Sequence, residues 1–255
     1  MAERLDQTGL RPANVALSDL SLVIREGWRL FRAAPLPSLA YASVAALIGL
    51  VLLYAVGRLG VSPMSLPFAG GFMLVAPAML GGFFRLAQCL ETNQDVTMAT
   101  PFAAFLRTPL QTWMVSLFCA FIFLIWITDA GVLYSFIIGG TDLPYELPWL
   151  IRVNESIAGF WFWGALMGSV LAFIIFTISA FSVPLLFEGR GGLVQAVHAS
   201  VRAVFANFVV TMLWALILSL SILVAIMLLP LLLVVLPVMA YASFALYRIV
   251  FPSSN

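Results

Sequence analysis

Six long apolar stretches constrain what this chain can fold into. A helix needs about 20 apolar residues to cross roughly 30 Å of hydrocarbon. The stretches that reach this length are 36–56, 66–84, 110–132, 159–181, 208–228 and 231–250. Hydrophobic residues make up 63% of the chain and charged residues 9%, against about 45–50% and 25% in a soluble domain. The sequence therefore predicts an all-α polytopic membrane protein with six transmembrane helices, in one membrane domain over 1–255.

The last two apolar stretches run together, broken only by Pro230 and Pro237. A single helix over both would far exceed the thickness of the bilayer. We therefore expect a tight outer hairpin near Leu229 and Pro230.

The arginines are unevenly distributed around these spans. The chain has no lysine, and with six spans every arginine except Arg58 and Arg152 falls on the side of the two termini. Basic residues near span ends stay in the cytoplasm. Both termini are therefore expected to be cytoplasmic.

An amphipathic segment precedes the first span. Leu20, Ile24 and Phe31 recur at helical spacing together with Leu17 and Trp28, and arginines take the other face. Such a helix is expected to lie in the membrane interface. Similar segments that contain Arg107 and Arg202 precede the third and fifth spans, so the sequence predicts three interfacial helices.

The three interfacial helices suggest an internal threefold repeat. Each unit is an interfacial helix followed by a transmembrane hairpin, over 17–84, 97–181 and 191–251, after a flexible N-terminus at 1–16. The second helix of each hairpin carries or adjoins a proline: Pro77, Pro184 and Pro237. These prolines either shape the helices or line a cavity with freed carbonyl groups, as in transporters.

Anionic lipid headgroups are the partners that the charges favour most directly. Nucleic acid is not expected, because binding it needs a dense basic face. The residues predicted to contact lipid at the interface are Arg25, Trp28, Arg29, Arg32, Arg85, Arg107, Arg202 and Arg248.

Three small residues mark a close helix contact. Gly164 and Gly168 form a Gly-x-x-x-Gly pair that Ala172 extends, which lets another backbone approach. We expect internal packing more than dimerisation. Asp129 is interpreted as an interfacial carboxylate, solvated or paired with Arg152, with a proton-coupling or ion-coupling role as the alternative. His198 is interpreted as a membrane-surface residue, with a catalytic or pH-sensing role as the alternative.

The chain resembles the DUF2189 family of bacterial integral membrane proteins. The resemblance rests on stretches such as Asp19-Leu20 through Gly27-Trp28, Ala69-Gly70-Gly71-Phe72 with Pro77, and Ser182-Val183-Pro184 followed by Ala199 to Val204 and Asn207, with Tyr247-Arg248 at the close. It implies a bacterial inner membrane and no established activity. Some members are labelled as similar to the large subunit of cytochrome c oxidase, but one histidine cannot supply the ligands of haem and copper sites.

The motifs of common enzymes are absent from the sequence. It has no phosphate-cradling loop, no zinc spacing and no nucleophile with a base and an orienting group. We therefore expect a non-catalytic protein without a cofactor, an accessory or assembly subunit of a larger membrane complex, with a respiratory complex as one candidate. The alternative is a transporter or channel for an apolar or amphipathic solute.

Overall fold

The computed structural model describes residues 10–59, 62–65, 67–68, 77–139 and 155–252, and its regular structure within them is helical. The all-α class is therefore confirmed for this part of the chain. The helices are α2 (Leu17–Ala33), α3 (Pro35–Arg58), the 3-10 helix η2 (Ser62–Met64), α5 (Pro77–Glu91), α6 (Thr100–Leu106), α7 (Leu110–Ile137), α8 (Glu155–Ser179), α9 (Ser182–Phe187), α10 (Leu193–Ala206), α11 (Phe208–Met227) and α12 (Leu229–Val250).

Five helices among the described residues are long and apolar enough to cross a membrane. They correspond to five of the six predicted spans, with ends that differ by a few residues. They are Pro35–Arg58, Leu110–Ile137, Glu155–Phe187, Phe208–Ile226 and Leu229–Val250. The predicted second span, 66–84, lies partly outside the described residues, and its described helix, α5, begins at Pro77 and continues to Glu91. The described residues therefore carry five candidate spans.

The predicted hairpin between the last two stretches is present. Helix α11 ends at Met227, Leu228 follows, and α12 begins at Leu229. Pro230 lies in the first turn of α12, where a missing backbone N–H costs no hydrogen bond. The two helices pack against each other as antiparallel neighbours.

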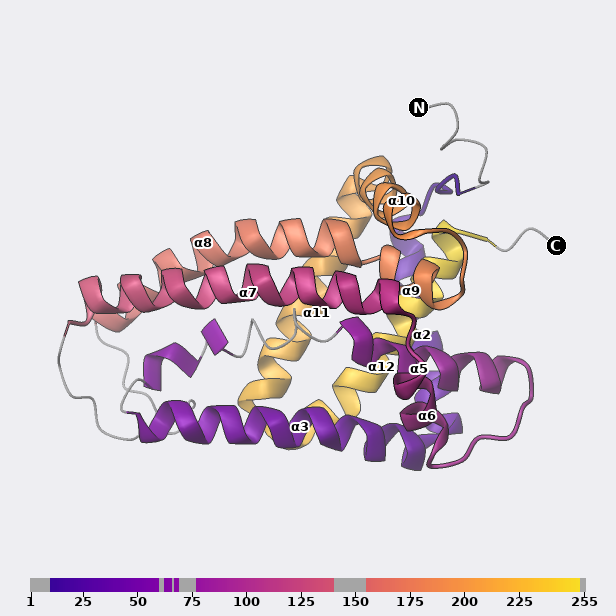
Figure 1. Ribbon diagram of the computed structural model, residues 1–255, viewed down its shortest axis with the longest axis horizontal. Coiled ribbons are helices and arrows are strands. Elements are labelled where there is room, and N and C mark those ends of the chain that lie inside the picture. The colour runs from indigo at the N-terminus through magenta and orange to yellow at the C-terminus, as the bar shows by residue number, and fades with distance from the viewer. Residues whose placement is uncertain (1–9, 60–61, 66, 69–76, 140–154, 253–255) are drawn as a thin grey trace.

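Short and long helices separate along the molecule. Figure 1 shows α2, α5, α6, α9 and α10 gathered near one end, from which α3, α7 and α8 extend toward the opposite end. We call these the arginine end and the far end. Exposed arginines such as Arg25, Arg107 and Arg202 belong to helices of the arginine end, whereas Arg58 closes α3 at the far end.

Helix α2 packs along α12, the most extensive helix contact in the described structure. The side chains of Leu20, Val23 and Leu30 are buried in this contact. A Cβ on Gly27 would lie 2.4 Å from the carbonyl oxygen of Val238, so only glycine fits there. Gly27 thus allows the backbones of α2 and α12 to approach closely.

The buried face of α2 differs from the predicted apolar face. Leu17 and Trp28 were expected beside Leu20 and Phe31, but their exposed fractions are 56% and 47%. The cause is steric, because the close approach at Gly27 turns the side of the helix that carries Gly27 toward α12 and leaves the indole outside. The predicted apolar face is therefore divided between a buried side and an exposed side.

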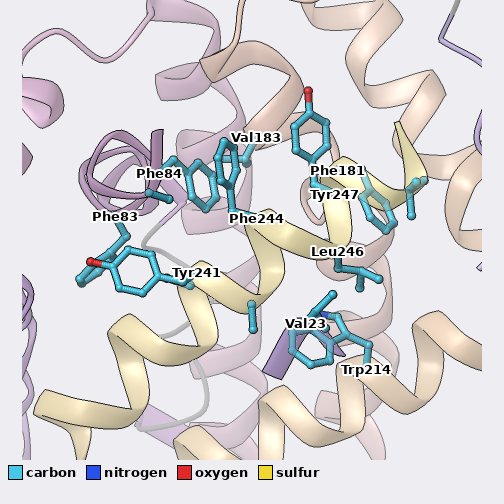
Figure 2. Close-up of a cluster of buried hydrophobic side chains, with 14 of the residues drawn as sticks. Val23, Phe83, Phe84, Phe181, Val183, Trp214, Tyr241, Phe244, Leu246 and Tyr247 are labelled. Atoms are coloured by element: carbon cyan, nitrogen blue, oxygen red, sulfur yellow. The ribbon is translucent and has the colours of Figure 1, made fainter. Parts of the chain in front are cut away.

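A core of aromatic side chains joins α5, α12 and the start of α9 near the arginine end. Figure 2 shows Phe84 against Phe244 and Phe83 against Tyr241. The ring centroids of Phe84 and Phe244 are 4.7 Å apart and stacked, and those of Phe83 and Tyr241 are 5.9 Å apart and perpendicular. Phe181 is buried beside the end of α12. Such contacts add about 0.5–1.5 kcal/mol per pair beyond the area that they bury.

The N-terminal segment before α2 is held in place. The Ala13 amide donates to the Val250 carbonyl at 2.8 Å. The buried Asn207 side chain donates to the Ala13 carbonyl at 3.0 Å and accepts from the Val15 amide at 2.8 Å. These bonds involve residues 10–16, part of the N-terminus that the sequence predicts to be flexible, and we call these residues the strap; residues 1–9 lie outside the described part.

Candidate functional site

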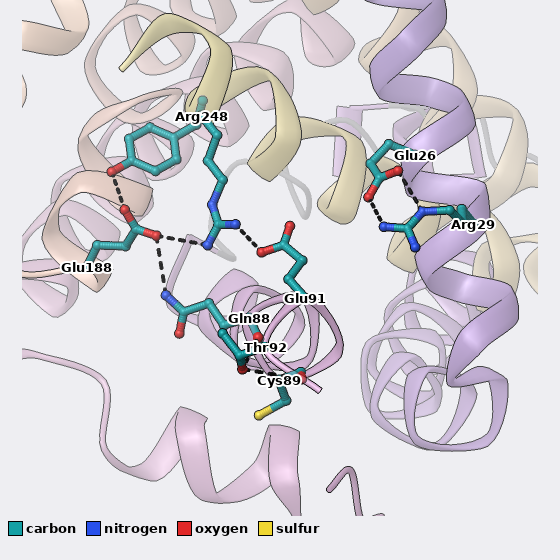
Figure 3. Close-up of polar contacts among 9 residues, drawn as sticks. Glu26, Arg29, Gln88, Cys89, Glu91, Thr92, Glu188 and Arg248 are labelled. Atoms are coloured by element: carbon teal, nitrogen blue, oxygen red, sulfur yellow. Dashed lines mark hydrogen bonds and ion pairs between the residues drawn. The ribbon is translucent and has the colours of Figure 1, made fainter. Parts of the chain in front are cut away.

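Arg248 joins two carboxylates at the arginine end (Figure 3). Its Nη1 donates to Oε2 of Glu91, and its Nη2 lies 3.3 Å from Oε1 of Glu188. Glu91 ends α5, Glu188 caps the C-terminus of α9, and Arg248 lies in the last turn of α12. One guanidinium therefore ties together three helices that are far apart in the sequence.

Glu188 receives hydrogen bonds from several donors. The Tyr247 hydroxyl donates to its Oε2 at 2.7 Å, and the Gln88 amide donates to its Oε1 at 3.3 Å. With Arg248, three side chains donate to this carboxylate, whose exposed fraction is 17%. Because a partly buried carboxylate needs such partners, Glu188 is the best-satisfied acid of the cluster.

Arg190 extends the same cluster to the end of α12. Its guanidinium donates to the Phe251 carbonyl at 2.6 Å, to the Pro252 carbonyl at 3.0 Å and to the Tyr247 hydroxyl at 3.2 Å. The loop that carries Arg190 turns at Gly189, whose φ of +68° suits glycine. A cation over the last carbonyl groups of a helix is favourable. We call Glu91, Glu188, Arg190, Tyr247 and Arg248 the clasp.

A further ion pair on α2 lies near the clasp. Nε of Arg29 donates to Oε2 of Glu26 at 2.8 Å, and Figure 3 shows this pair beside Glu91. The hydrogen bond from Arg29 lowers the pKa of Glu26. Burial raises the pKa of Glu91, with Arg248 opposing and the charges of Glu26 and Glu188 adding to the rise.

The chemistry of the clasp is that of a charged joint between helices. Arginine stays protonated in proteins and binds carboxylates with a planar, fixed geometry. In the part of the chain that the structure describes, no group of three or more His, Cys, Asp or Glu is placed to hold a metal ion. The arrangement fixes helix ends, and its polar atoms are used within the molecule.

Three of the eight residues predicted to contact lipid bind other side chains of the same molecule. Arg248 belongs to the clasp, Arg29 is paired with Glu26, and Arg85 donates to Oε1 of Gln94 at 3.2 Å. The others are exposed residues of helices at the arginine end or of the turns that end them: Arg25, Trp28, Arg32, Arg107 and Arg202. Sequence alone could not identify the contacts of Arg248, Arg29 and Arg85.

The three prolines predicted to shape helices or line a cavity are all buried. Near Pro77, the Ala78 amide donates to Oγ of Ser116 on α7 at 3.0 Å. Near Pro184, the Phe181 amide donates to Oγ of Ser200 at 3.2 Å. Pro237 lies inside α12. Hydroxyl groups from neighbouring helices thus bond backbone groups next to two of the three sites.

The predicted small-residue contact on α8 faces α7. A Cβ on Gly168 would lie 2.7 Å from Cη2 of Trp126, whereas a Cβ on Gly164 would lie 3.9 Å from it. Ala172 follows one turn later and is half-buried. Gly168 therefore makes the space that the indole of Trp126 occupies, within one molecule.

Two indoles bind backbone carbonyls of the segment that follows α3. Nε1 of Trp126 donates to the Pro67 carbonyl at 3.0 Å, and Nε1 of Trp161 donates to the Pro63 carbonyl at 3.1 Å. Backbone carbonyls of a membrane protein need such partners where lipid offers no donor. We call Trp126 and Trp161 the indole pair.

Asp129 and His198 are not part of the clasp. Asp129 is half-buried in α7, and its proposed partner Arg152 lies outside the described residues. His198 is exposed on α10, and its side chain has no hydrogen bond with any described residue.

Sequence reasoning missed several residues that the structure brings together. Glu91 of the clasp and Trp126 of the indole pair were not singled out, and Tyr247 and Asn207 were named only for the family resemblance. A signal existed for the clasp, because Glu91 and Glu188 follow apolar segments at the same side as Arg248. No comparable signal exists for the indole pair, since tryptophan is common in membrane helices.

Comparison with known proteins supports the family resemblance. The family model of predicted integral membrane proteins named DUF2189 matches residues 65–188. The resemblance is thus confirmed over this part, which contains α5 to α9 with Glu91, Glu188, Trp126 and Gly168. Arg248 lies outside the matched part. No curated protein and no solved structure matches the chain.

Proposed function

We propose that this integral membrane protein is a non-catalytic accessory or assembly subunit of a larger membrane complex in the bacterial inner membrane. The observation that carries the proposal is the packed aromatic core of the described residues. Aromatic side chains fill the space between α5 and α12, and the clasp uses its charges internally. A protein of this kind acts through its lipid-facing and partner-facing surface.

The same proposal includes six spans in three units, with both termini in the cytoplasm. The described helices follow the order of a leading helix and two further helices: α2 before α3 and α5, α6 before α7 and α8, and α10 before α11 and α12. The arginines at the end that carries α2, α6 and α10 favour a cytoplasmic location for that end. A cysteine-accessibility map from both sides of the membrane tests the orientation.

The experiment on the complex starts from membranes extracted in a mild detergent. We expect the protein to migrate on a native gel well above its monomer mass of 27.8 kDa plus bound detergent. A second membrane protein should be present in the same band at a fixed ratio to this chain. Deleting the chain should then lower the amount of that assembled complex. A chain that migrates alone after every mild extraction contradicts the proposal.

A transporter or channel for an apolar or amphipathic solute is the second candidate. One observation favours it: the indoles of Trp126 and Trp161 bind the backbone carbonyls of Pro67 and Pro63, next to prolines of the segment after α3. Backbone groups near prolines that bind side chains of neighbouring helices also occur where transporters line a cavity. Flux of an apolar fluorescent solute into proteoliposomes, reduced by Pro77→Ala, would support this candidate over the first.

A further inference from the structure

Helix α2 presents a second face that its contact with α12 leaves open. Its buried side is fixed, because Gly27 touches the α12 backbone and the helix has no room to turn there. The side next to it carries Leu17 and Trp28, with exposed fractions of 56% and 47%, followed around the helix by Arg25 and Arg32. Apolar and cationic groups therefore share one exposed surface.

The spacing places the two arginines on either side of the indole. Arg25 precedes Trp28 by three positions and Arg32 follows it by four, so the three side chains are neighbours on the helix surface. Within the described chain, neither Arg25 nor Arg32 has an ion pair or a side-chain hydrogen bond. Arg29, on the same helix, is already bound to Glu26. Two of the three central arginines of α2 are therefore free to bind an external anion.

We propose that Arg25, Trp28 and Arg32 form a binding site for an anionic glycerophospholipid. The guanidinium groups of Arg25 and Arg32 bind the phosphate, and the indole of Trp28 lies at the boundary between headgroup and acyl chain. The apolar contact of Trp28 and Leu17 distinguishes a lipid from a free phosphate ion, which has no apolar part. The site rests on the proposed function, in which the arginine end faces the cytoplasmic leaflet.

The test measures lipid retention by the full-length protein in detergent, with phosphatidylglycerol as the probe and phosphatidylcholine as the neutral reference. Native mass spectrometry counts the bound lipids over a titration. Each arginine near a membrane surface contributes about 1 kcal/mol, so R25Q/R32Q should weaken phosphatidylglycerol binding by roughly tenfold to thirtyfold. Trp28→Ala should weaken it as well, and Trp28→Phe by less.

Arg29→Gln is the matched control, because it removes an arginine from the same helix that Glu26 already neutralises. It should leave binding within about twofold of wild type. Equal weakening by Arg29→Gln and R25Q/R32Q would overturn the proposal in favour of unspecific attraction. Competition by inorganic phosphate at millimolar concentration would also overturn it, as the site would then be one for phosphate alone.

This experiment separates the lipid site from the proposed function. Lipid retention in detergent does not depend on orientation or on partner proteins, so a failed lipid test leaves the accessory role standing. A cysteine map that places the arginine end outside the cell contradicts the proposed orientation while the binding result stands.

Discussion

The clasp and the indole pair hold the two ends of the molecule by different means. At the arginine end, Arg248 and Glu188 each contact several partners, and the groups are partly exposed. Toward the far end, Trp126 makes one hydrogen bond, and Gly168 makes the space for its ring. The contacts of the clasp depend on charge, and the contact between Trp126 and Gly168 depends on shape.

The difference follows from the solvent at each end. Charged side chains at the water interface lose little solvation and can share partners, so removing one contact leaves others. Within hydrocarbon, a free carbonyl has no water to turn to, so one lost hydrogen bond carries its full cost. The far end should therefore be the more sensitive to single substitutions.

Gly168→Ala should have the largest effect of these substitutions. Its methyl group would collide with Trp126 and displace the indole from the Pro67 carbonyl. Overpacking and the lost bond together should cost about 2–4 kcal/mol of unfolding free energy, measured in detergent micelles. Gly164→Ala is the control, where the space is ordinary and alanine should be neutral or stabilising. Equal effects at the two positions would contradict the steric role of Gly168.

Trp126→Phe should come next, at about 1–3 kcal/mol, because it keeps a ring but leaves the Pro67 carbonyl without its donor. Combined with Gly168→Ala, the loss should be smaller than the sum, since both changes break one contact. A double-mutant cycle in the same detergent measures this coupling. Strict additivity would show that Gly168 and Trp126 act separately.

Glu188→Gln should be the strongest single change to a clasp carboxylate, at about 1–2 kcal/mol. Its amide cannot accept from all three donors that surround it. Glu91→Gln should cost less than about 0.5 kcal/mol, because Glu91 has one partner and its charge is disfavoured by burial. Thermal unfolding of both variants decides the order, and a larger loss for Glu91→Gln would reverse our assignment of the central acid.

The smallest expected effect is a pH dependence at Glu91. Its pKa is raised above the usual 4.5, so the folded protein binds the proton more tightly than the unfolded chain. Stability should rise by well under about 1 kcal/mol as the pH falls through the folded pKa toward 4.5, and Glu91→Gln should abolish that rise. The Glu26 pair has the opposite sign, as its pKa is lowered and its contribution is lost below 4.5. A pH series of wild type and Glu91→Gln isolates the Glu91 contribution.

Much of the helix layout could be predicted from the sequence, because long apolar segments have few alternatives in a membrane. The hairpin at Leu228 illustrates this, since the length of the apolar run required a turn. The rotation of α2 could not be predicted in the same way. Its apolar face is wider than the contact with α12, and the close approach at Gly27 decides which of the apolar residues are buried.

The site could be predicted less well than the fold. An arginine at a span end looks the same whether it binds lipid, as proposed for Arg32, or a carboxylate from a distant helix, as Arg248 does. The distinction depends on tertiary contacts between residues more than a hundred positions apart. The residue pattern of a single segment carries no information about such distant contacts.

The strap couples the order of synthesis to the order of assembly. Ala13 and Asn207 are 194 positions apart, so at about 5–20 residues per second some 10–40 s pass before the partner of Ala13 exists. Val250 is made later still. The first part of the described chain to leave the ribosome is therefore among the last to reach its final place. During that interval its amide groups have to be satisfied by water.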